Sequence, residues 1–230
     1  VIEQVRGRAP VIAGTGSNST TEAISLTRHA AEAGADAALM IAPYYNRPTQ
    51  KGLYDHFKAV AQKVDIPIVL YNHQGRTGVT IQPETIHQLS KVGRFAAVKD
   101  ASGGIDYASR VLDLCEGKVA VLSGNDTWTL ALLALGGSGV ISVVANIAPR
   151  EMRQLVHEFL NGNADRARRL HYKLLPLMKA MELEVNPAPV KTAMGLMGFI
   201  SSEVRLPLAP MERRNVDSLK KTLKECKLLK

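Results

Sequence analysis

The chain has 230 residues, of which 46% are apolar, and a formal net charge of +8 at neutral pH. This length suits one large domain or two small ones with a sizeable core, and no apolar stretch is long enough to span a membrane. The two cysteines, Cys115 and Cys226, lie far apart without the spacing of a metal or redox motif. They are typical of reduced thiols in a cytosolic protein.

About half of the excess basic charge lies near the C-terminal end. Residues 211–230 contain seven Lys or Arg and three Asp or Glu, and their apolar side chains recur at spacings of three and four, which predicts an amphipathic helix. Nucleic-acid binding would combine a basic patch with aromatic residues for stacking, and this segment has no aromatic residue. We therefore expect neither nucleic acid nor a membrane as a partner, although basic charge can steer small anionic substrates.

Short apolar runs alternate with helical segments over the first 160 residues. The predicted strands are 10–14, 37–42, 67–71, 95–99, 119–123 and 139–144. The predicted helices that follow them are 20–34, 49–64, 83–92, 106–115, 126–135 and 149–160. Such alternation predicts βαβ units and a parallel sheet. Several strands consist almost wholly of Val, Ile, Leu and Ala, as expected when both faces of a sheet are covered.

These elements fit a TIM-type barrel better than a dinucleotide-binding sheet. Gly14-Thr15-Gly16 lacks the third glycine of the dinucleotide fingerprint. A complete barrel has eight strands, whereas six are predicted here, and residues 1–8 resemble the last turns of a helix that leads into a strand. Beyond the strands, helices are predicted at 164–181, at 187–197 and in the basic tail. We therefore predict a partial β/α barrel over 1–160 and a C-terminal helical region over 161–230.

The carboxyl ends of the predicted strands hold the residues with the clearest chemical potential. In a TIM barrel the active site lies at these ends. Lys99 ends one strand, Tyr44, Tyr45 and Tyr71 follow or end two others, and Arg76 comes five residues after Tyr71. A lysine can form an imine with a carbonyl substrate, a tyrosine can move protons, and an arginine can bind a carboxylate. This set predicts Schiff-base chemistry.

Other interpretations of these residues stay open. Lys99 could be a solvated lysine at a strand end, the tyrosines could pack at an interface, and Glu22 is explained by a capping box that begins at Ser19. A metal-dependent aldolase would need several His or carboxylate ligands together, but only His73 of the six histidines follows a strand. A serine hydrolase would need a nucleophile elbow, and no G-x-S-x-G motif is present. We expect no metal and no cofactor.

A series of short motifs runs through the chain in order. They lie at 14–18, 43–48, 70–72, 76–78, 98–103, 122–126, 139–142 and 186–191. Together they resemble the dihydrodipicolinate synthase family, which belongs to the class I pyruvate aldolases and includes N-acetylneuraminate lyase among its relatives. The resemblance implies a lyase that condenses pyruvate with L-aspartate 4-semialdehyde in the first committed step of lysine (diaminopimelate) biosynthesis. It also implies a homo-oligomer, either a dimer or a tetramer, in the cytoplasm, or in the plastid stroma of a plant.

The resemblance implies a role for each residue of the predicted site. Lys99 would form the imine with pyruvate, Tyr71 would shuttle protons, and Tyr45 would complete a proton relay in the active site of a neighbouring subunit. The implied substrate-binding residues are Arg76, Thr77, Gly124 and Ile141, with Arg76 holding the carboxylate of the semialdehyde. The implied site for L-lysine as a feedback inhibitor consists of Gly16, Asn18, Glu22 and Tyr44.

The chain departs from the family pattern in two places. His73-Gln74-Gly75 stands where the family usually has Val-Pro-Ser or Val-Pro-Gly. Loss of that proline loosens the loop that presents Arg76, so an aldolase of another, sugar-acid substrate is an alternative.

The family's first two βα units are also absent, with their Gly-Thr-Thr-Gly-Glu-type motif for the pyruvate carboxylate. We expect one of three situations: a longer protein, strands supplied by oligomer contacts, or a truncated homologue that is catalytically weak. If the chain is a truncated homologue, a scaffold or regulatory role without catalysis is a further alternative.

Overall fold

The strands form one sheet that follows the order of the chain. The computed structural model describes residues 1–229, and its strands are β1 (Ile12–Gly14), β2 (Ala37–Ile41), β3 (Ile68–Asn72), β4 (Phe95–Asp100), β5 (Ala120–Ser123) and β6 (Gly139–Val140). Their order in the sheet is β1-β2-β3-β4-β5-β6, and each neighbouring pair from β1 to β5 is parallel. This arrangement confirms the predicted partial TIM-type barrel with a helical C-terminal part.

The helices divide between two compact units. The sheet unit consists of residues 1–124 and 135–139, and the helical unit consists of residues 125–134 and the chain from residue 140 onward. The sheet unit contains α1 (Ile2–Val5), α2 (Thr20–Glu32), α3 (Gln50–Lys63), α4 (Gln74–Thr77), α5 (Pro83–Ser90) and α6 (Ile105–Cys115). The helical unit contains η1 (Asp126–Trp128), α7 (Thr129–Ala134), η2 (Val144–Asn146), α8 (Pro149–Leu160), α9 (Ala164–Ala180), α10 (Ala188–Leu196) and α11 (Arg213–Glu225). The predicted division of the chain at residue 160 stays a prediction.

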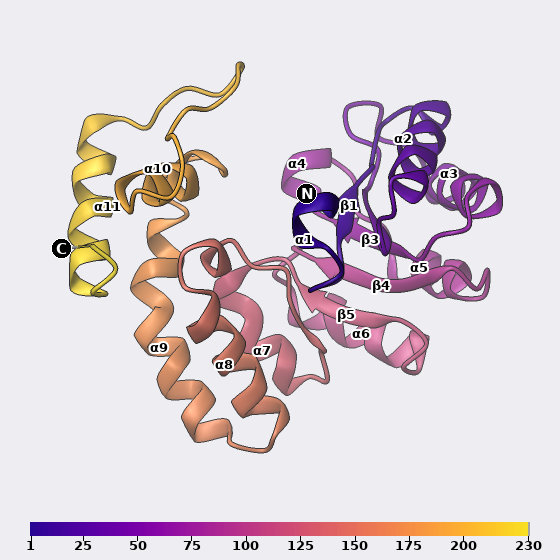
Figure 1. Cartoon of the computed structure of the whole chain (residues 1–230). Coiled ribbons are helices and arrows are strands. Elements are labelled where there is room, and N and C mark those ends of the chain that lie inside the picture. The colour runs from indigo at the N-terminus through magenta and orange to yellow at the C-terminus, as the bar shows by residue number, and fades with distance from the viewer. Residues whose placement is uncertain (230) are drawn as a thin grey trace. The chain divides into compact units, whose positions relative to one another are not determined.

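Crossover helices cover one side of the sheet in the sheet unit (Figure 1). Because successive parallel strands are joined by right-handed crossovers, their helices fall on the same side. In α3, Leu53, Phe57 and Val60 are fully buried, at the spacing of one helical face. The strands beneath are covered as well, and Ile68 and Leu70 of β3 have no exposed surface. The helix-covered side of the sheet is therefore buried by the predicted apolar runs. Alternate residues of β2 and β5 are only partly buried, and both ends of β1 are exposed, so the expected cover on both faces is incomplete.

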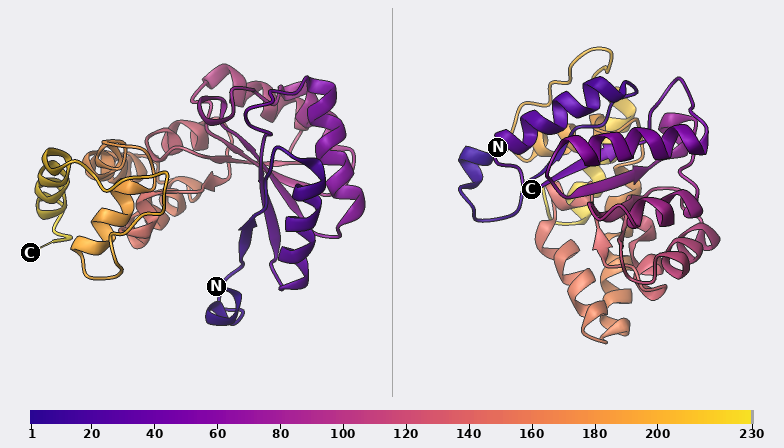
Figure 2. Two further views of the ribbon diagram at one scale, coloured as in Figure 1. Left: turned by 90° about the horizontal axis from the view of Figure 1, so that it is seen from above. Right: turned by 90° about the vertical axis from the view of Figure 1, so that its right-hand side faces the viewer.

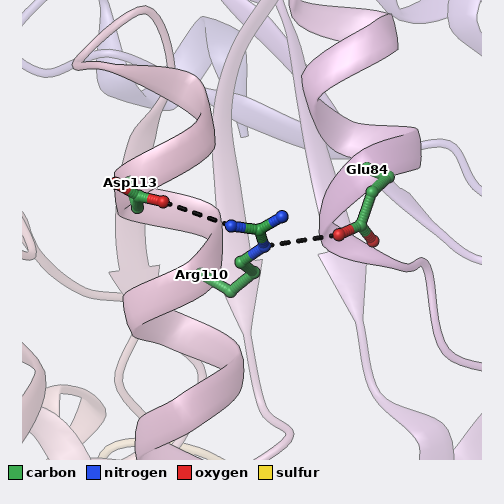
Figure 3. A network of polar contacts seen from close by, with 3 residues as sticks. All are labelled: Glu84, Arg110 and Asp113. Carbon is green, nitrogen blue, oxygen red and sulfur yellow. Dashed lines mark hydrogen bonds and ion pairs between the residues drawn. The ribbon is translucent and has the colours of Figure 1, made fainter.

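Local sequence explains where several of these helices begin. The backbone N–H of Glu22 donates to the Ser19 hydroxyl at 3.4 Å, so the predicted cap of α2 is present. Thr49 caps α3 in the same way, and α5 begins at Pro83, whose fixed φ suits the first helical position. On the outer surface, Arg110 of α6 pairs with Glu84 of α5 and with Asp113 of its own helix (Figure 3). These ion pairs are exposed, and each contributes at most about 1 kcal/mol to the free energy of unfolding.

The helical unit has its own core. Its fully buried side chains include Val144, Leu155, Leu219 and Leu223, contributed by η2, α8 and α11, and Figure 2 gives two further views of these helices. The basic tail forms α11, and its apolar residues turn into this core. The prediction of an amphipathic tail helix is therefore confirmed. Among residues 1–229, no helix combines the length and the apolar character needed to cross a bilayer.

The last strand is shorter than predicted. The expected strand 139–144 ends at Val140, because the backbone N–H groups of Val143 and Val144 donate to the Asp126 carboxylate at 3.0 Å each. A backbone that bonds to this side chain cannot continue a ladder. It turns into η2 instead. The expected helix 126–135 likewise divides into η1 and α7.

Candidate active site

The candidate nucleophile and the candidate proton shuttle lie opposite each other on adjacent strands. Tyr71 of β3 pairs with Lys99 of β4 in the parallel register, and paired residues of neighbouring strands project from the same face of a sheet. The Nζ atom of Lys99 lies 4.1 Å from the centroid of the Tyr71 ring, within the range of a cation–π contact. The two residues predicted to act on one carbonyl are therefore in direct contact.

This pairing depends on a register shift between β3 and β4, which leaves one extra residue in β4 as in a β-bulge. Ile68 pairs with Phe95, but the next residue, Val69, pairs with Ala97, so the register shifts by one residue at Ala96. Without that extra residue, Lys99 would lie opposite Asn72. Because side chains alternate between the two faces of a sheet, the bulge determines that Lys99 and Tyr71 share a face. Bulges are frequent next to active sites for this reason.

A short turn after β3 brings Arg76 beside Tyr71. The Thr77 hydroxyl donates to the carbonyl groups of His73 and Val79 at 3.1 and 2.8 Å, and Gly78 ends α4 with φ 75°. Burial raises the pKa of Tyr71, and the Arg76 guanidinium partly offsets this. Tyr71 is therefore a protonated phenol at neutral pH, able to donate a proton. The hydroxyl of Thr77 is engaged in the turn, and its predicted contact with substrate stays a prediction.

His73 is a neutral imidazole at the same place. Burial lowers its pKa, and the cations Arg76 and Lys99 lower it further. Its ring packs edge-on against Tyr71 with the ring centroids 5.8 Å apart. The ring also lies close to Gly75, where an added Cβ would be 3.4 Å from its Cε1 atom. Residues 73–75, which differ from the family pattern, thus pack together next to Tyr71.

A buried polar network, which the sequence prediction missed, holds the chain just after Lys99. The Asp100 carboxylate is fully buried and accepts hydrogen bonds from the N–H and hydroxyl of Ser102 and from the Asn72 amide, at 3.0, 2.9 and 3.3 Å. Burial raises the pKa of Asp100, and these bonds partly offset the rise. An Asp followed two residues later by Ser is a signal for an Asx-turn. That signal could have identified the turn, although not the partner on β3.

Gly124 follows β5 and contacts the same turn. Its N–H donates to the Asp100 carbonyl at 2.6 Å. An added Cβ would lie 2.8 Å from the Cβ of Ala101 and 3.0 Å from the Asp100 carbonyl oxygen. Only glycine fits this contact. Ile141, the other residue predicted to line the pocket, belongs to the helical unit, and its role stays a prediction.

The loop after β2 contains two residues in an unusual conformation. Tyr45 and Arg47 have φ values of 70° and 44°, in the left-handed region that bulky side chains rarely adopt. The Asn46 side chain between them donates to the Asn18 carbonyl at 3.0 Å. Tyr45 is 90% exposed, and its predicted place in a relay between subunits stays a prediction.

The four residues predicted to bind L-lysine lie in two neighbouring loops and in the first turn of α2, which contains Glu22. Gly16 packs so closely on β2 that an added Cβ would lie 2.6 Å from the Ile41 nitrogen. The Ser17 hydroxyl donates to the Glu22 carboxylate. The Asn18 carbonyl accepts the hydrogen bond from the Asn46 side chain, which lies in the same loop as Tyr44. Hydrogen bonding therefore joins the two loops, while binding of lysine there stays a prediction.

An open pocket lies beside the turn that carries Arg76. We call it the outer pocket; its volume is about 580 Å³, and it is lined by Arg47, His73, Gln74, Gly75, Gly78, Ala101 and Ser102. The Arg47 guanidinium lies against Gly78, where an added Cβ would be 2.6 Å from Nε. Within residues 1–229, no three His, Cys, Asp or Glu side chains are grouped so that they could hold a metal ion.

A lysine in register with a half-buried tyrosine, at the carboxyl ends of adjacent strands in a partial TIM barrel, defines a lyase of the class I aldolase type. The sequence agrees with this class. Residues 1–226 match the model of the dihydrodipicolinate synthetase family. The chain belongs to this family.

Individual relatives support the same assignment. The 4-hydroxy-tetrahydrodipicolinate synthase of Citrifermentans bemidjiense is 56% identical over 229 residues, which cover 100% of this chain and 79% of that protein. A crystal structure of the chloride-inhibited dihydrodipicolinate synthase from Acinetobacter baumannii, complexed with pyruvate, has a TM-score of 0.97 at 42% identity and covers 99% of this chain and 78% of that one. The enzyme from Cyanidioschyzon merolae with lysine bound has a TM-score of 0.96 at 36% identity, with the same coverage of 99% and 78%.

Proposed function

We propose that the chain condenses pyruvate with L-aspartate 4-semialdehyde to give 4-hydroxy-tetrahydrodipicolinate, the first committed step of lysine biosynthesis. The observation that carries the proposal is the contact between Lys99 and Tyr71, with Nζ 4.1 Å from the ring centroid. The relative from Acinetobacter baumannii, complexed with pyruvate, supports the choice of the first substrate. The names of relatives such as that from Citrifermentans bemidjiense support the choice of reaction.

The first half of the proposed reaction forms an imine. The Lys99 ammonium group first loses a proton, and the free amine then adds to the keto carbon of pyruvate and gives a carbinolamine. The Tyr71 phenol donates a proton to the departing hydroxyl group, which leaves as water. Because burial raises the pKa of Tyr71, the phenol keeps its proton until this step. Tyr45 of a neighbouring subunit returns a proton to Tyr71 in this scheme.

The second half forms the carbon–carbon bond. Loss of a proton from the methyl group of the imine gives an enamine, whose carbon attacks the aldehyde carbon of the semialdehyde while the aldehyde oxygen takes up a proton. The amino group of the semialdehyde then displaces Lys99 from the imine carbon, which closes the ring and frees the lysine. Arg76 holds the carboxylate of the semialdehyde through charge-assisted hydrogen bonds. Thr77 and Gly124 line the pocket in this scheme.

L-lysine is proposed as an inhibitor of this enzyme. It would bind at Gly16, Asn18, Glu22 and Tyr44. The bound lysine in the relative from Cyanidioschyzon merolae supports this choice. We also propose a dimer or tetramer in the cytoplasm, where cysteine thiols stay reduced.

Reduction with borohydride tests the imine directly. Incubation with pyruvate and borohydride should add one reduced pyruvyl unit to Lys99, located by peptide mass spectrometry. Lys99→Ala should abolish the adduct, and Tyr71→Phe should slow its formation by about 10²-fold, as expected for the loss of a general acid. An equal adduct yield in Lys99→Ala would exclude the proposed nucleophile.

The turn at residues 73–75 favours a second candidate function. His73, Gln74 and Gly75 line the outer pocket, and this sequence differs from the usual family pattern. The alternative is a pyruvate-dependent aldolase that acts on a sugar-acid aldehyde. Rates with a panel of aldehydes, each supplied with saturating pyruvate, separate the two functions. A clear preference for a sugar-acid aldehyde would show that such an aldehyde, and not the semialdehyde, is the second substrate.

A further inference from the structure

Arg47 has an exposed guanidinium that is not used to hold the fold together. Within residues 1–229 it makes no hydrogen bond and no ion pair. Two other arginines of the sheet unit do have such partners: Arg94 pairs with Asp65, and Arg110 pairs with Glu84 and Asp113. A charge without an internal partner is available to an external one.

The backbone around Arg47 holds this side chain in place at a cost in strain. Arg47 itself has φ 44° and Tyr45 has φ 70°, and residues in this region cost on the order of 1–3 kcal/mol each. The hydrogen bond from Asn46 to the Asn18 carbonyl supports the strained loop. Gly78 provides the space for the guanidinium, because any Cβ there would lie 2.6 Å from Nε of Arg47. Strain of this kind gathers at functional sites.

The outer pocket in which Arg47 lies has the polarity of an anion site. Its lining contains no carboxylate, and Arg47 is the one permanently charged residue among those that line it. His73 is neutral, because burial and the nearby cations lower its pKa. Asp100, which directly precedes the lining residue Ala101, is fully buried and engaged by Ser102 and Asn72. An anion that enters this pocket meets a guanidinium and no opposing charge.

We propose that Arg47 is the outer docking residue for a small aldehyde that bears a carboxylate. Its guanidinium captures the carboxylate at the mouth. Arg76, which lies in α4 beside the lining residues Gln74 and Gly75, then holds the carboxylate during the reaction. A charge at the rim of a site raises the association rate, and salt screens this effect. The identity of the aldehyde rests on the proposed function, but the docking of an anion in the outer pocket does not.

Steady-state kinetics at two ionic strengths test the proposal. In Arg47→Gln, kcat/KM for the aldehyde should fall about tenfold in dilute buffer and about twofold near 1 M salt, where the Debye length is about 3 Å. The value of kcat and the KM for pyruvate should stay unchanged, because neither depends on capture of the aldehyde. Arg47→Lys should keep most of the effect, since it retains the charge.

The matched control is Arg28→Gln, which removes an exposed arginine of α2 that has no ion pair among the described residues and does not line the outer pocket. It should leave kcat/KM for the aldehyde unchanged. An equal loss in both variants would show a general charge effect and would overturn the assignment. So would an Arg47→Gln variant that keeps the wild-type salt dependence. Circular dichroism melting curves confirm that each variant is folded.

A second measurement does not depend on turnover. Phenylglyoxal modifies accessible guanidinium groups, and peptide mass spectrometry reports which ones react. Succinate semialdehyde, a four-carbon aldehyde with one carboxylate, should protect Arg47 at least fivefold and leave Arg28 unprotected. Protection without any pyruvate adduct on Lys99 would refute the proposed function and keep the docking site. A pyruvate adduct with no protection of Arg47 would do the reverse.

Discussion

Replacing Gly124 with alanine should slow imine formation at Lys99 without unfolding the sheet. The new methyl group would lie 2.8 Å from the Cβ of Ala101, 3.0 Å from the Asp100 carbonyl oxygen and 3.2 Å from the Cα of Ala101. All three atoms belong to the backbone or are attached directly to it, so no side-chain rotation relieves the contact. The segment that must move begins one residue after Lys99.

The size of the effect follows from this geometry. Overpacking by one methyl group at a rigid contact costs about 1–3 kcal/mol of unfolding free energy. Relief of the contact also lengthens the 2.6 Å bond from the Gly124 N–H to the Asp100 carbonyl. A displacement of the order of 1 Å at a reacting group can lower a rate about 10²-fold. We therefore expect a loss of stability of about 2 kcal/mol and a 10- to 100-fold slower imine formation.

Two assays and one control variant make the prediction sharp. Urea unfolding gives the stability. Samples of a reaction with pyruvate are reduced with borohydride at timed intervals, and the growth of the reduced adduct gives the rate of imine formation. The control is Gly14→Ala at the end of β1, where an added Cβ meets no heavy atom within 4 Å. It should be neutral, or more stable by up to about 1 kcal/mol through the unfolded state. Wild-type stability and rate in Gly124→Ala would refute the reasoning.

Three further predictions concern stability. His56 is 6% exposed, and burial lowers its pKa from 6.5 to about 4. Its contribution to folding stability is therefore complete above pH 6.5 and is lost as the pH falls towards 4. Urea unfolding should show about 2–3 kcal/mol less stability at pH 4.5 than at pH 7.5 from this group, and His56→Gln should remove that part of the pH dependence. Asp100→Ala leaves the donors of Ser102 and Asn72 buried without an acceptor, and should cost about 3–5 kcal/mol in urea, with Asp100→Asn costing less. Leu219→Ala opens a cavity in the core of the helical unit and should cost about 2–5 kcal/mol by calorimetry or urea, whereas a value below 1 kcal/mol would show that α11 is not part of that core.

The sequence predicted those parts of the fold that depend on local signals. The apolar run at residues 95–98 and the cap at Ser19 are properties of a few neighbouring residues, and both lie where they were expected. The short helix α4 was not predicted. It depends on the Thr77 hydroxyl, which bonds to carbonyl groups on both sides of the turn, and on Gly78 with φ 75°. The early end of β6 depends on the Asp126 carboxylate, which lies 17 residues before the N–H of Val143 along the chain.

The sequence likewise predicted only those parts of the candidate site that depend on local signals. Strand-end reasoning predicted that Lys99 and Tyr71 would share one rim, because the carboxyl ends of parallel strands meet at the same edge. It did not predict the bond between Asn72 and Asp100, since 28 residues separate them and their contact requires both strands in register. Nor did it predict a role for Arg47, whose position follows from the strained loop and from the absence of a side chain at Gly78.

The single extra residue in β4 links the fold to the chemistry. Ile68 pairs with Phe95 and Val69 with Ala97, so Ala96 has no partner in the register. A regular ladder from Phe95 would pair Tyr71 with Val98 and Asn72 with Lys99. Since neighbouring residues of a strand point to opposite faces, Lys99 would then be on the face opposite Tyr71. The network of Asn72, Asp100 and Ser102 holds the shifted register at the other end of the strand. In the proposed mechanism, imine chemistry therefore depends on strand register as much as on Lys99 itself, because its amine can meet Tyr71, the proposed proton donor, only on the shared face.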